Sequence, residues 1–337
     1  MQSGAADALP LVGDALLRAA RIAVLVGVGV FLANVAVEFG AVEWFAGLSR
    51  YLTGPANLPD EAGTAVLTTA VSTTAGYGML ADFRESGRLS DRATLVAVTI
   101  NTFFGFFQHV LTFYVPVLIP VLGARVGVMY VGARAAIAAA ITLTGVVGGA
   151  VLLPSPERRA DGTPGDDPAD PERADGGTDD AADAGDGPDG RRGRLRAAAG
   201  STRSTVRRIV PRLVVVYTLV TLVVAYVDLE SLSSAAGPLA EVAGLPAAAV
   251  PVVVVFAFDT TAGAATVAPM VGGALTAEGA VVTMLLGGIV SFAVSTFKRS
   301  IPFQYGVWGP AFGSKVVALN TVLKVVFISI AVAFFLA

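Results

Sequence analysis

The sequence predicts an all-α fold: a polytopic helical membrane protein with about eight transmembrane helices in two homologous repeats. Of its 337 residues, 54% are hydrophobic and 15% are charged, whereas soluble domains average about 45–50% apolar and about 25% charged residues. The apolar residues form continuous blocks, several of which reach the roughly 20 residues that a helix needs to cross a bilayer. These blocks occupy residues 22–37, 93–107, 135–153, 213–227, 245–258, 280–297 and 316–337.

Two segments of the chain are versions of one another. The motif Ser72-Thr73-Thr74-Ala75-Gly76 returns as Asp259-Thr260-Thr261-Ala262-Gly263, 187 positions later. Further matches in the same order are Leu58-Pro59 with Leu245-Pro246, Pro116 with Pro302, Gly123 with Gly309, and Gly127 with Gly313. Landmarks that keep their order at a nearly constant offset indicate an internal duplication. A duplicated apolar unit with polar, Gly-rich interruptions is typical of a transporter whose site lies between the repeats.

We predict three parts: membrane repeat one at 1–154, a linker at 155–205 and membrane repeat two at 206–337. Residues 156–190 hold most of the aspartates, with Pro, Gly and Ala and few large apolar residues. Such a segment buries too little apolar surface to offset its ordering entropy, so we expect it to be disordered. The arginines that follow should lie at the cytoplasmic membrane surface. Abundant Asp, with Arg far above Lys, also suits a salt-adapted (halophilic) organism.

The elements of the two repeats are expected in the same order. Repeat one should contain spans at 19–38, from Glu61 to the first motif, at 93–122 and at 126–153, with a short interfacial helix at 42–51. Repeat two should contain spans at 213–227, 245–258, 280–297 and 316–337, with a short piece at 229–242 and a re-entrant piece around 298–310.

Two topologies follow from counting the spans. Four spans in each half make the repeats parallel, and they place the N-terminus, the loop 82–92 and the linker on the cytoplasmic side. Five spans, with the stretch 93–122 split near Gln108 and His109, make the repeats inverted and place the linker outside. The arginines at the basic end of the linker favour four spans and a multi-pass cell-membrane protein, because cytoplasmic loops carry an excess of Arg and Lys.

Asp259 is the first candidate site residue, because it follows the apolar run 250–258. A carboxylate inside a membrane costs several kcal/mol unless it is paired or faces water, so its presence indicates a function. It could bind a coupling cation or proton, or accept a hydrogen bond from a substrate hydroxyl. The alternatives are an ion pair with Lys298 or Arg299 and an ordinary charge at a helix end.

The two Thr-Thr-Ala-Gly motifs predict breaks in membrane helices. Glycine weakens a helix, and free backbone groups at membrane depth are tolerated only where protein or an aqueous cavity satisfies them. We therefore expect a substrate site between the segments 72–77 and 259–263, with packing of small residues as the alternative. The proposed members are Ser72, Thr73, Thr74, Gly76, Tyr77, Asp259, Thr260, Thr261 and Gly263.

Other polar residues interrupt the apolar blocks and complete the predicted site. Asn101, Gln108 and His109 lie in an otherwise apolar, aromatic stretch. Gln108 and His109 could hydrogen-bond a base or a sugar, and His109 could carry protons. The alternative for these residues is hydrogen bonding between helices. Lys298 and Arg299 could hold an anion or anchor the chain at the interface, and Gln304 follows in the same segment.

Several classes of chemistry find no support in the sequence. The chain has no cysteine and one histidine, so Cys-ligated metals and His-rich sites are excluded. It contains no P-loop, G-x-S-x-G or H-E-x-x-H motif. We therefore expect neither an enzyme nor a cofactor, and no nucleic-acid partner.

At the two Ser/Asp-Thr-Thr-Ala-Gly motifs, the chain resembles the nucleoside-recognition (Gate) domain family of membrane proteins. That family includes parts of concentrative nucleoside transporters, the spore maturation proteins and the membrane core of B-type ferrous iron transporters. The chain looks most like the stand-alone, paired-Gate type found in haloarchaea, over residues 20–153 and 210–335. The resemblance implies binding or movement of a nucleoside. The chain departs from the iron transporters because it lacks a GTPase domain and Gate-segment cysteines.

The combined expectation is a membrane permease that moves a nucleoside-like or other small polar solute, with ion coupling through Asp259 as one option. Its expected partners are the lipid bilayer and the solute, and a homo-oligomer is compatible with this interpretation. The alternatives are a scaffold or assembly protein that transports nothing and a metal-ion transporter.

Overall fold

The computed structural model describes residues 3–39, 48–154, 188–226, 246, 248–296 and 300–337. These residues are almost entirely helical and form no β-strand. Within them, four helices are long and apolar enough to cross a membrane: 12–32, 91–122, 124–152 and 301–336. The predicted class, a helical membrane protein, is confirmed to that extent.

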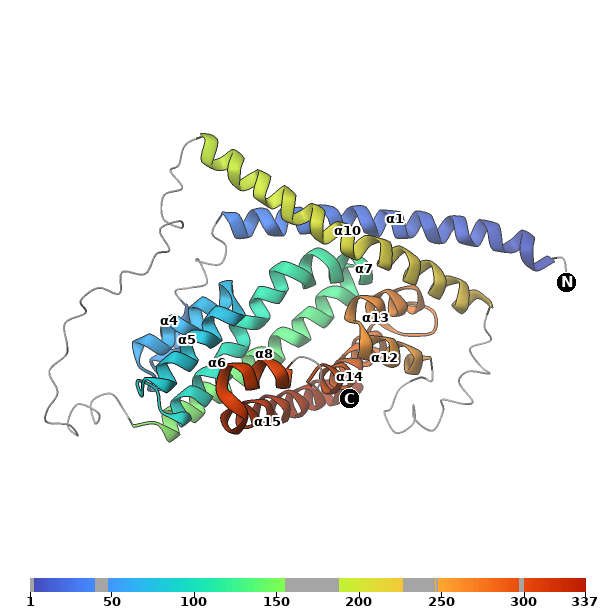
Figure 1. The fold of residues 1–337 in the computed structure, drawn as a ribbon. Helices are drawn as coiled ribbons and strands as arrows, with labels where there is room; N and C mark the ends of the chain where they lie inside the picture. The colour runs from blue at the N-terminus through green and yellow to red at the C-terminus, as the bar shows by residue number, and fades with distance from the viewer. Residues whose placement is uncertain (1–2, 40–47, 155–187, 227–245, 247, 297–299) are drawn as a thin grey trace, which may run out of the picture.

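The first half of the chain forms a long helix, two short paired helices and a long helical hairpin (Figure 1). Its elements are α1 (Ser3–Glu38), α3 (Leu48–Thr53), α4 (Asp60–Val71), α5 (Thr73–Glu85), α6 (Asp91–His109), the π-helical segment η1 (Val110–Leu118), α7 (Ile119–Leu122) and α8 (Ala124–Leu152). The stretch 91–122 is one helical path without a break at Gln108 and His109. The π-helical segment contains Pro116, whose missing N–H interrupts regular helical bonding.

The second half also contains two short helices followed by two long ones. Its elements are α10 (Pro188–Tyr226), α12 (Ala249–Phe258), α13 (Thr260–Val267), the 3₁₀ turn η2 (Ala268–Met270), α14 (Ala277–Ser295) and α15 (Ile301–Leu336). The domain boundary that we predicted at residue 205 lies inside α10, because the basic segment and the apolar block after it form one helix. The short interfacial helix predicted at 42–51 is described only from Leu48, where α3 begins. The short piece predicted at 229–242 lies outside the described residues.

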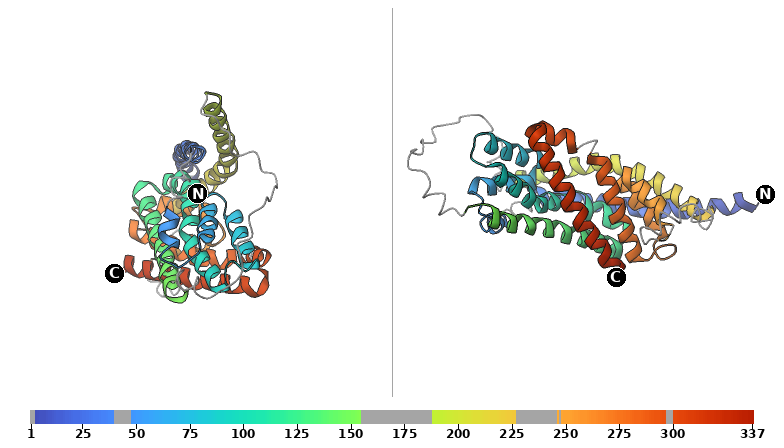
Figure 2. Two further views of the ribbon diagram at one scale, coloured as in Figure 1. Left: turned by 90° about the vertical axis from the view of Figure 1, so that its left-hand side faces the viewer. Right: turned by 90° about the horizontal axis from the view of Figure 1, so that it is seen from below.

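Helices α1 and α10 lie side by side along one face of the remaining bundle, as Figures 1 and 2 show. The Nδ2 atom of Asn34 in α1 donates a hydrogen bond to the Thr202 hydroxyl in α10 over 3.0 Å. Gly29 of α1 packs against η1, since an added Cβ would lie 2.9 Å from the Cα of Pro116. Small and polar residues thus bring these helices together, as is common between membrane helices.

Large apolar side chains are exposed along the outer surfaces of α1, α8 and α15. Leu17 is 61% exposed, Val151 is 76% exposed and Phe334 is 77% exposed. Because lipid tails solvate such side chains without cost, this exposure fits helices that contact a bilayer. The structure and the sequence therefore agree on membrane association.

The two motifs occupy matching breaks between short helices. Ser72 separates α4 from α5 with φ −143° and ψ 109°, and Asp259 separates α12 from α13 with φ −152° and ψ 117°. Each residue caps the helix that follows: the Ser72 hydroxyl accepts from the N–H of Ala75 over 3.3 Å, and the Asp259 carboxylate accepts from the N–H of Ala262 over 2.6 Å. The predicted breaks in the helices are confirmed.

A second pair of matched positions also shares its backbone geometry. Gly123, between α7 and α8, has φ 78° and ψ 160°, and Gly309, inside α15, has φ 73° and ψ 163°. This left-handed region favours glycine over residues with a Cβ. Both halves therefore bend a long helical segment at the glycine that the sequence comparison had matched.

The motif glycines allow each short helix to contact its predecessor closely. A Cβ at Gly76 would lie 2.7 Å from the carbonyl oxygen of Ala65, and a Cβ at Gly263 would lie 2.6 Å from the Cα of Phe256. Real Cβ atoms essentially never come this close to other heavy atoms. The two short helices on either side of each break can pack this closely only because these positions lack a side chain.

We predict that Gly76→Ala and Gly263→Ala each lower the stability by about 1–3 kcal/mol, because they overpack a close helix contact. Thermal unfolding of the purified protein, followed by tryptophan fluorescence, measures the effect. Gly78→Ala is the matched control, since an added Cβ at Gly78 meets no heavy atom within 4 Å. Equal midpoints for all three variants would contradict the close contact.

Candidate functional site

Two adjoining cavities lie between the long helices and the two breaks. The first has a volume of about 260 Å³ and is lined from α4, α5, α6, η1, α8 and α15. The second has a volume of about 290 Å³ and is lined from α6, η1, α8, α12, α13, α14 and α15. Five residues line both: His109, Tyr114, Arg134, Lys324 and Ile328. The cavities therefore meet at these side chains.

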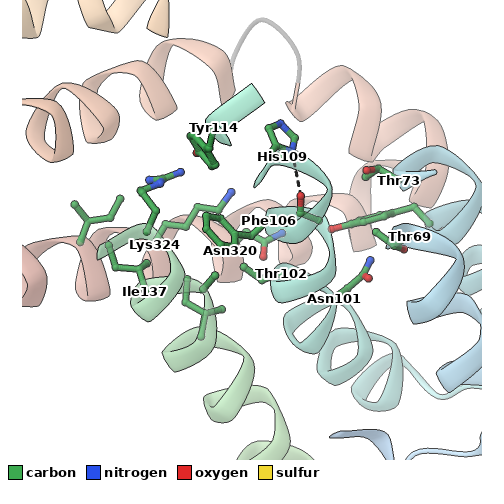
Figure 3. Close-up of a pocket in the computed structure, with 16 residues that line it drawn as sticks. Thr69, Thr73, Asn101, Thr102, Phe106, His109, Tyr114, Ile137, Asn320 and Lys324 are labelled. Carbon is green, nitrogen blue, oxygen red and sulfur yellow. Dashed lines mark hydrogen bonds between the residues drawn. The ribbon is translucent and has the colours of Figure 1, made fainter. Parts of the chain in front are cut away.

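The first cavity is polar at the end next to the first break. Thr69 and Thr73 lie there with Asn101, while Lys324 and Tyr114 lie at the opposite end (Figure 3). The Thr73 hydroxyl donates a hydrogen bond to Oε1 of Gln108 over 2.9 Å. This bond ties the start of α5 to α6 and leaves the Thr73 oxygen free to accept from a solute.

Asn101 is the polar residue in this cavity whose hydrogen-bonding groups are least satisfied. Its side chain is 98% buried, and neither its amide nitrogen nor its amide oxygen has a hydrogen-bond partner. Leaving a buried polar group unsatisfied costs about 1–3 kcal/mol, and most such groups in proteins have a partner. Since the residue lines a cavity, a bound water or solute would supply the hydrogen bonds that the protein does not.

Tyr77 joins α5 to the last helix. Its hydroxyl lies near the side chains of Gln304 and Asn320, and its ring packs edge-on against Trp308 at 6.1 Å between centroids. The Trp308 indole N–H donates to Oε1 of Gln304 over 2.6 Å. Gln304 is thus buried behind the cavity wall, where it holds Tyr77 in position.

The second cavity is more aromatic at its far end. Phe256 and Phe292 line it beside Thr260, the first residue of α13. The Lys324 ammonium nitrogen lies 4.3 Å from the centroid of the Phe292 ring, which is cation–π distance. The second break therefore presents one hydroxyl to a cavity with aromatic walls.

Equivalent positions of the two halves line the two cavities. Six pairs of lining residues lie 187 positions apart: Thr69 and Phe256, Thr73 and Thr260, Asn101 and Gly288, Gly105 and Phe292, Ile137 and Lys324, and Ile141 and Ile328. The offset is the same as between the motifs, so each half contributes the same face to its own cavity. The pairs differ in chemistry, because the polar Thr69 and Asn101 are replaced by phenylalanine and glycine.

Sequence reasoning missed the two cations where the cavities meet. Arg134 lies in α8, and its guanidinium lies near the Tyr114 side chain. A Cβ at Gly288 would lie 3.9 Å from its Nη1 atom, so the guanidinium reaches α14. Lys324 lies in α15, after the bend at Gly309. A single charge inside each of the spans predicted at 126–153 and 316–337 was the available signal.

The predicted site residues fall into three groups. Thr73, Tyr77, Asn101, His109 and Thr260 line a cavity. Six others have structural contacts. Gln108 accepts a hydrogen bond from Thr73, and Gln304 accepts one from Trp308. Ser72 and Asp259 cap the short helices, and Gly76 and Gly263 make close helix contacts. Thr74 and Thr261 are not among the cavity residues, and Lys298 and Arg299 lie outside the described residues.

The described carboxylates do not enter either cavity. The Asp259 carboxylate accepts a capping hydrogen bond from the N–H of Ala262. The alternative of a charge at a helix end accounts for this contact. No cluster of three or more His, Cys, Asp or Glu residues that could hold a metal ion occurs in the described part of the chain. The role of Asp259 as a ligand for a coupling cation stays a prediction.

We predict that Asn101→Leu raises the stability of the solute-free protein by about 1–3 kcal/mol, because it replaces an unsatisfied buried amide by an apolar group of similar shape. Asn320→Leu is the contrasting control. It makes the same change at an amide that lines the same cavity but is not among the unsatisfied buried groups, so it should not raise the stability. Thermal unfolding midpoints of both variants in one detergent provide the test, and a lowered midpoint for Asn101→Leu would show that the amide has a stabilising partner.

Comparison with known proteins finds relatives in one archaeon. The chain is 20% identical over 323 residues to "Uncharacterized protein MJ0880" of Methanocaldococcus jannaschii, an alignment that covers 94% of this chain and 97% of the relative. It is 28% identical over 125 residues to "Uncharacterized protein MJ0871" of the same organism, which covers 37% of this chain and 39% of that relative. The chain matches no protein-family model, and it matches no solved structure.

Proposed function

We propose that the protein is a membrane transporter of the Gate type that moves a small polar solute between two homologous repeats. The observation that carries the proposal is the pairing of cavity residues at a constant offset of 187 positions, with a broken helix beside each cavity. Discontinuous helices that meet at a repeat interface are the usual way in which transporters present backbone and hydroxyl groups to a solute.

The proposal gives the two halves a parallel relationship with four spans each. The uninterrupted path 91–122 supports this count over the five-span alternative. In this arrangement the N-terminus and the linker lie on the cytoplasmic side, where the arginines of α10 meet the lipid headgroups. The matched bends at Gly123 and Gly309 and the matched breaks at Ser72 and Asp259 support the duplication.

The solute would occupy the polar end of the first cavity and pass the junction toward the second. Thr73 and Asn101 offer hydrogen bonds to hydroxyl or amide groups, and Phe106 and Tyr114 offer aromatic surface. A nucleoside-like solute, as the resemblance implies, would use both kinds of contact. None of the roles requires an enzymatic step.

We predict that the double variant Thr73→Val, Thr260→Val lowers solute uptake by about 30-fold, because each change removes one cavity hydroxyl worth about 1 kcal/mol. Uptake of radiolabelled uridine, adenosine and the charged solutes described below into proteoliposomes provides the measurement. Thr144→Val on α8 is the control, since that hydroxyl is exposed and bonds only its own helix at Ala140.

The scaffold alternative is tested by deleting residues 156–187, which leaves α10 intact from Pro188. A transporter should keep its uptake, because the cavity residues all lie in the helical repeats. Loss of function in cells together with no uptake of any solute by the folded wild type would favour the scaffold.

For Asp259, we predict that Asp259→Asn leaves the thermal midpoint nearly unchanged, because Asn is as good an N-cap as Asp. Asp259→Ala should cost about 1 kcal/mol. Uptake measured at several Na⁺ concentrations and pH values then separates the roles. If Asp259→Asn retains the ion dependence of the wild type, the carboxylate is a cap and not a ligand for the coupling ion.

A further inference from the structure

We propose that the solute is a small organic anion, with its carboxylate or phosphate group held by Arg134 and Lys324 where the two cavities meet. This inference rests on the proposed transport function and names the class of its substrate. Both cations line both cavities, and the described lining residues include no Asp or Glu.

The first argument is charge. A charged side chain inside a membrane is costly, and such residues usually pair with one another or with a ligand. Here two positive side chains from different helices, α8 and α15, face the same space. Two cations at one site repel each other, and an anion between them removes that repulsion and replaces lost hydration.

The second argument is that the groups next to these cations are uncharged. Tyr114 lines both cavities with Arg134, and one neutral hydroxyl can accept only part of what five guanidinium N–H donors offer. Lys324 lies over the Phe292 ring, and an aromatic face attracts an ammonium but carries no net charge. A carboxylate or phosphate would accept from both groups, and guanidinium binds such oxyanions in a bidentate manner.

The third argument concerns the rest of the solute. Figure 3 places Lys324 and Tyr114 at one end of the first cavity and Thr73 and Asn101 at the other. The Asn101 amide is buried and unsatisfied, so it can both donate to and accept from a solute hydroxyl. The geometry thus matches a molecule with an anionic head and a hydroxyl-bearing body. At about 260 Å³ the cavity suits a small one.

The experiment measures binding by thermal stabilisation of the full chain in detergent, at constant ionic strength with a bulky sulfonate buffer as the background anion. The probes are glycerol 3-phosphate and glycerate, which share a body but differ in head, inorganic phosphate as a head alone, and glycerol as an uncharged body. Uridine represents the uncharged nucleoside. We expect stabilisation by at least one of the two organic anions and none by glycerol at the same concentration.

Matched variants assign the binding to the two cations. Arg134→Gln and Lys324→Gln should each weaken anion binding by roughly 10- to 100-fold, the usual range for a hydrogen bond to a charged group. Arg125→Gln on α8 and Lys315→Gln on α15 remove the same charges from the same helices at exposed positions and should leave binding unchanged. Lys324→Arg keeps the charge and should retain binding if Arg134→Gln fails to fold.

Asn101→Leu separates the head from the body. It should weaken binding of glycerol 3-phosphate or glycerate by about tenfold, the worth of a hydrogen bond to a buried amide, and should leave inorganic phosphate unaffected. An equal loss for inorganic phosphate would place the head at Asn101 and overturn the proposed orientation.

Two outcomes would overturn the anion site: stabilisation by uridine alone, or anion binding that survives in Arg134→Gln and Lys324→Gln. Uptake into proteoliposomes distinguishes a failure of the anion-site proposal from a failure of the transport proposal. Uridine uptake that both variants preserve, without anion binding, would remove the anion site and leave the transporter. Anion binding that depends on Arg134 and Lys324, with no uptake of any solute, would keep the site and remove transport.

Discussion

The structure depends on how a helix can be broken inside an apolar environment. Each break frees backbone N–H and C=O groups that lipid cannot satisfy. In both halves the residue at the break solves the problem locally, since Ser72 and Asp259 adopt extended geometry and accept a hydrogen bond from the helix that follows. The broken helices can therefore end next to a cavity, and the surrounding bundle stays ordered.

Close packing by glycine is the second requirement, because a broken helix must still bury its surfaces. Gly76 and Gly263 let each short helix contact its predecessor with no side chain between them. The bends at Gly123 and Gly309 then direct α8 and the last part of α15 past the breaks. These two helices are the ones that bring Arg134 and Lys324 to the junction of the cavities. Backbone freedom at a few glycines thus determines where charge is placed.

The two cavities share their construction but differ in chemistry. Asn101 in one half corresponds to Gly288 in the other, and this missing side chain leaves room for the Arg134 guanidinium next to α14. Thr69 corresponds to Phe256, which packs against Tyr130 at 6.4 Å between ring centroids. One half therefore supplies polar recognition and the other an aromatic wall with a cation. The two breaks therefore lie beside unlike surfaces, one polar and one aromatic.

The sequence by itself determined the helical membrane class and the position of both breaks, because composition and local backbone preferences act over short stretches. It also identified Thr73, Tyr77, Asn101, His109 and Thr260, which line the cavities. Only the tertiary structure decided that Arg134 meets Lys324, because this contact joins residues from separate helices. The Asp259 cap is a local contact with Ala262, and it is the helix-end alternative that the sequence had left open. Local pattern predicts where a helix starts and stops, whereas the meeting of two charges 190 positions apart depends on how the helices pack.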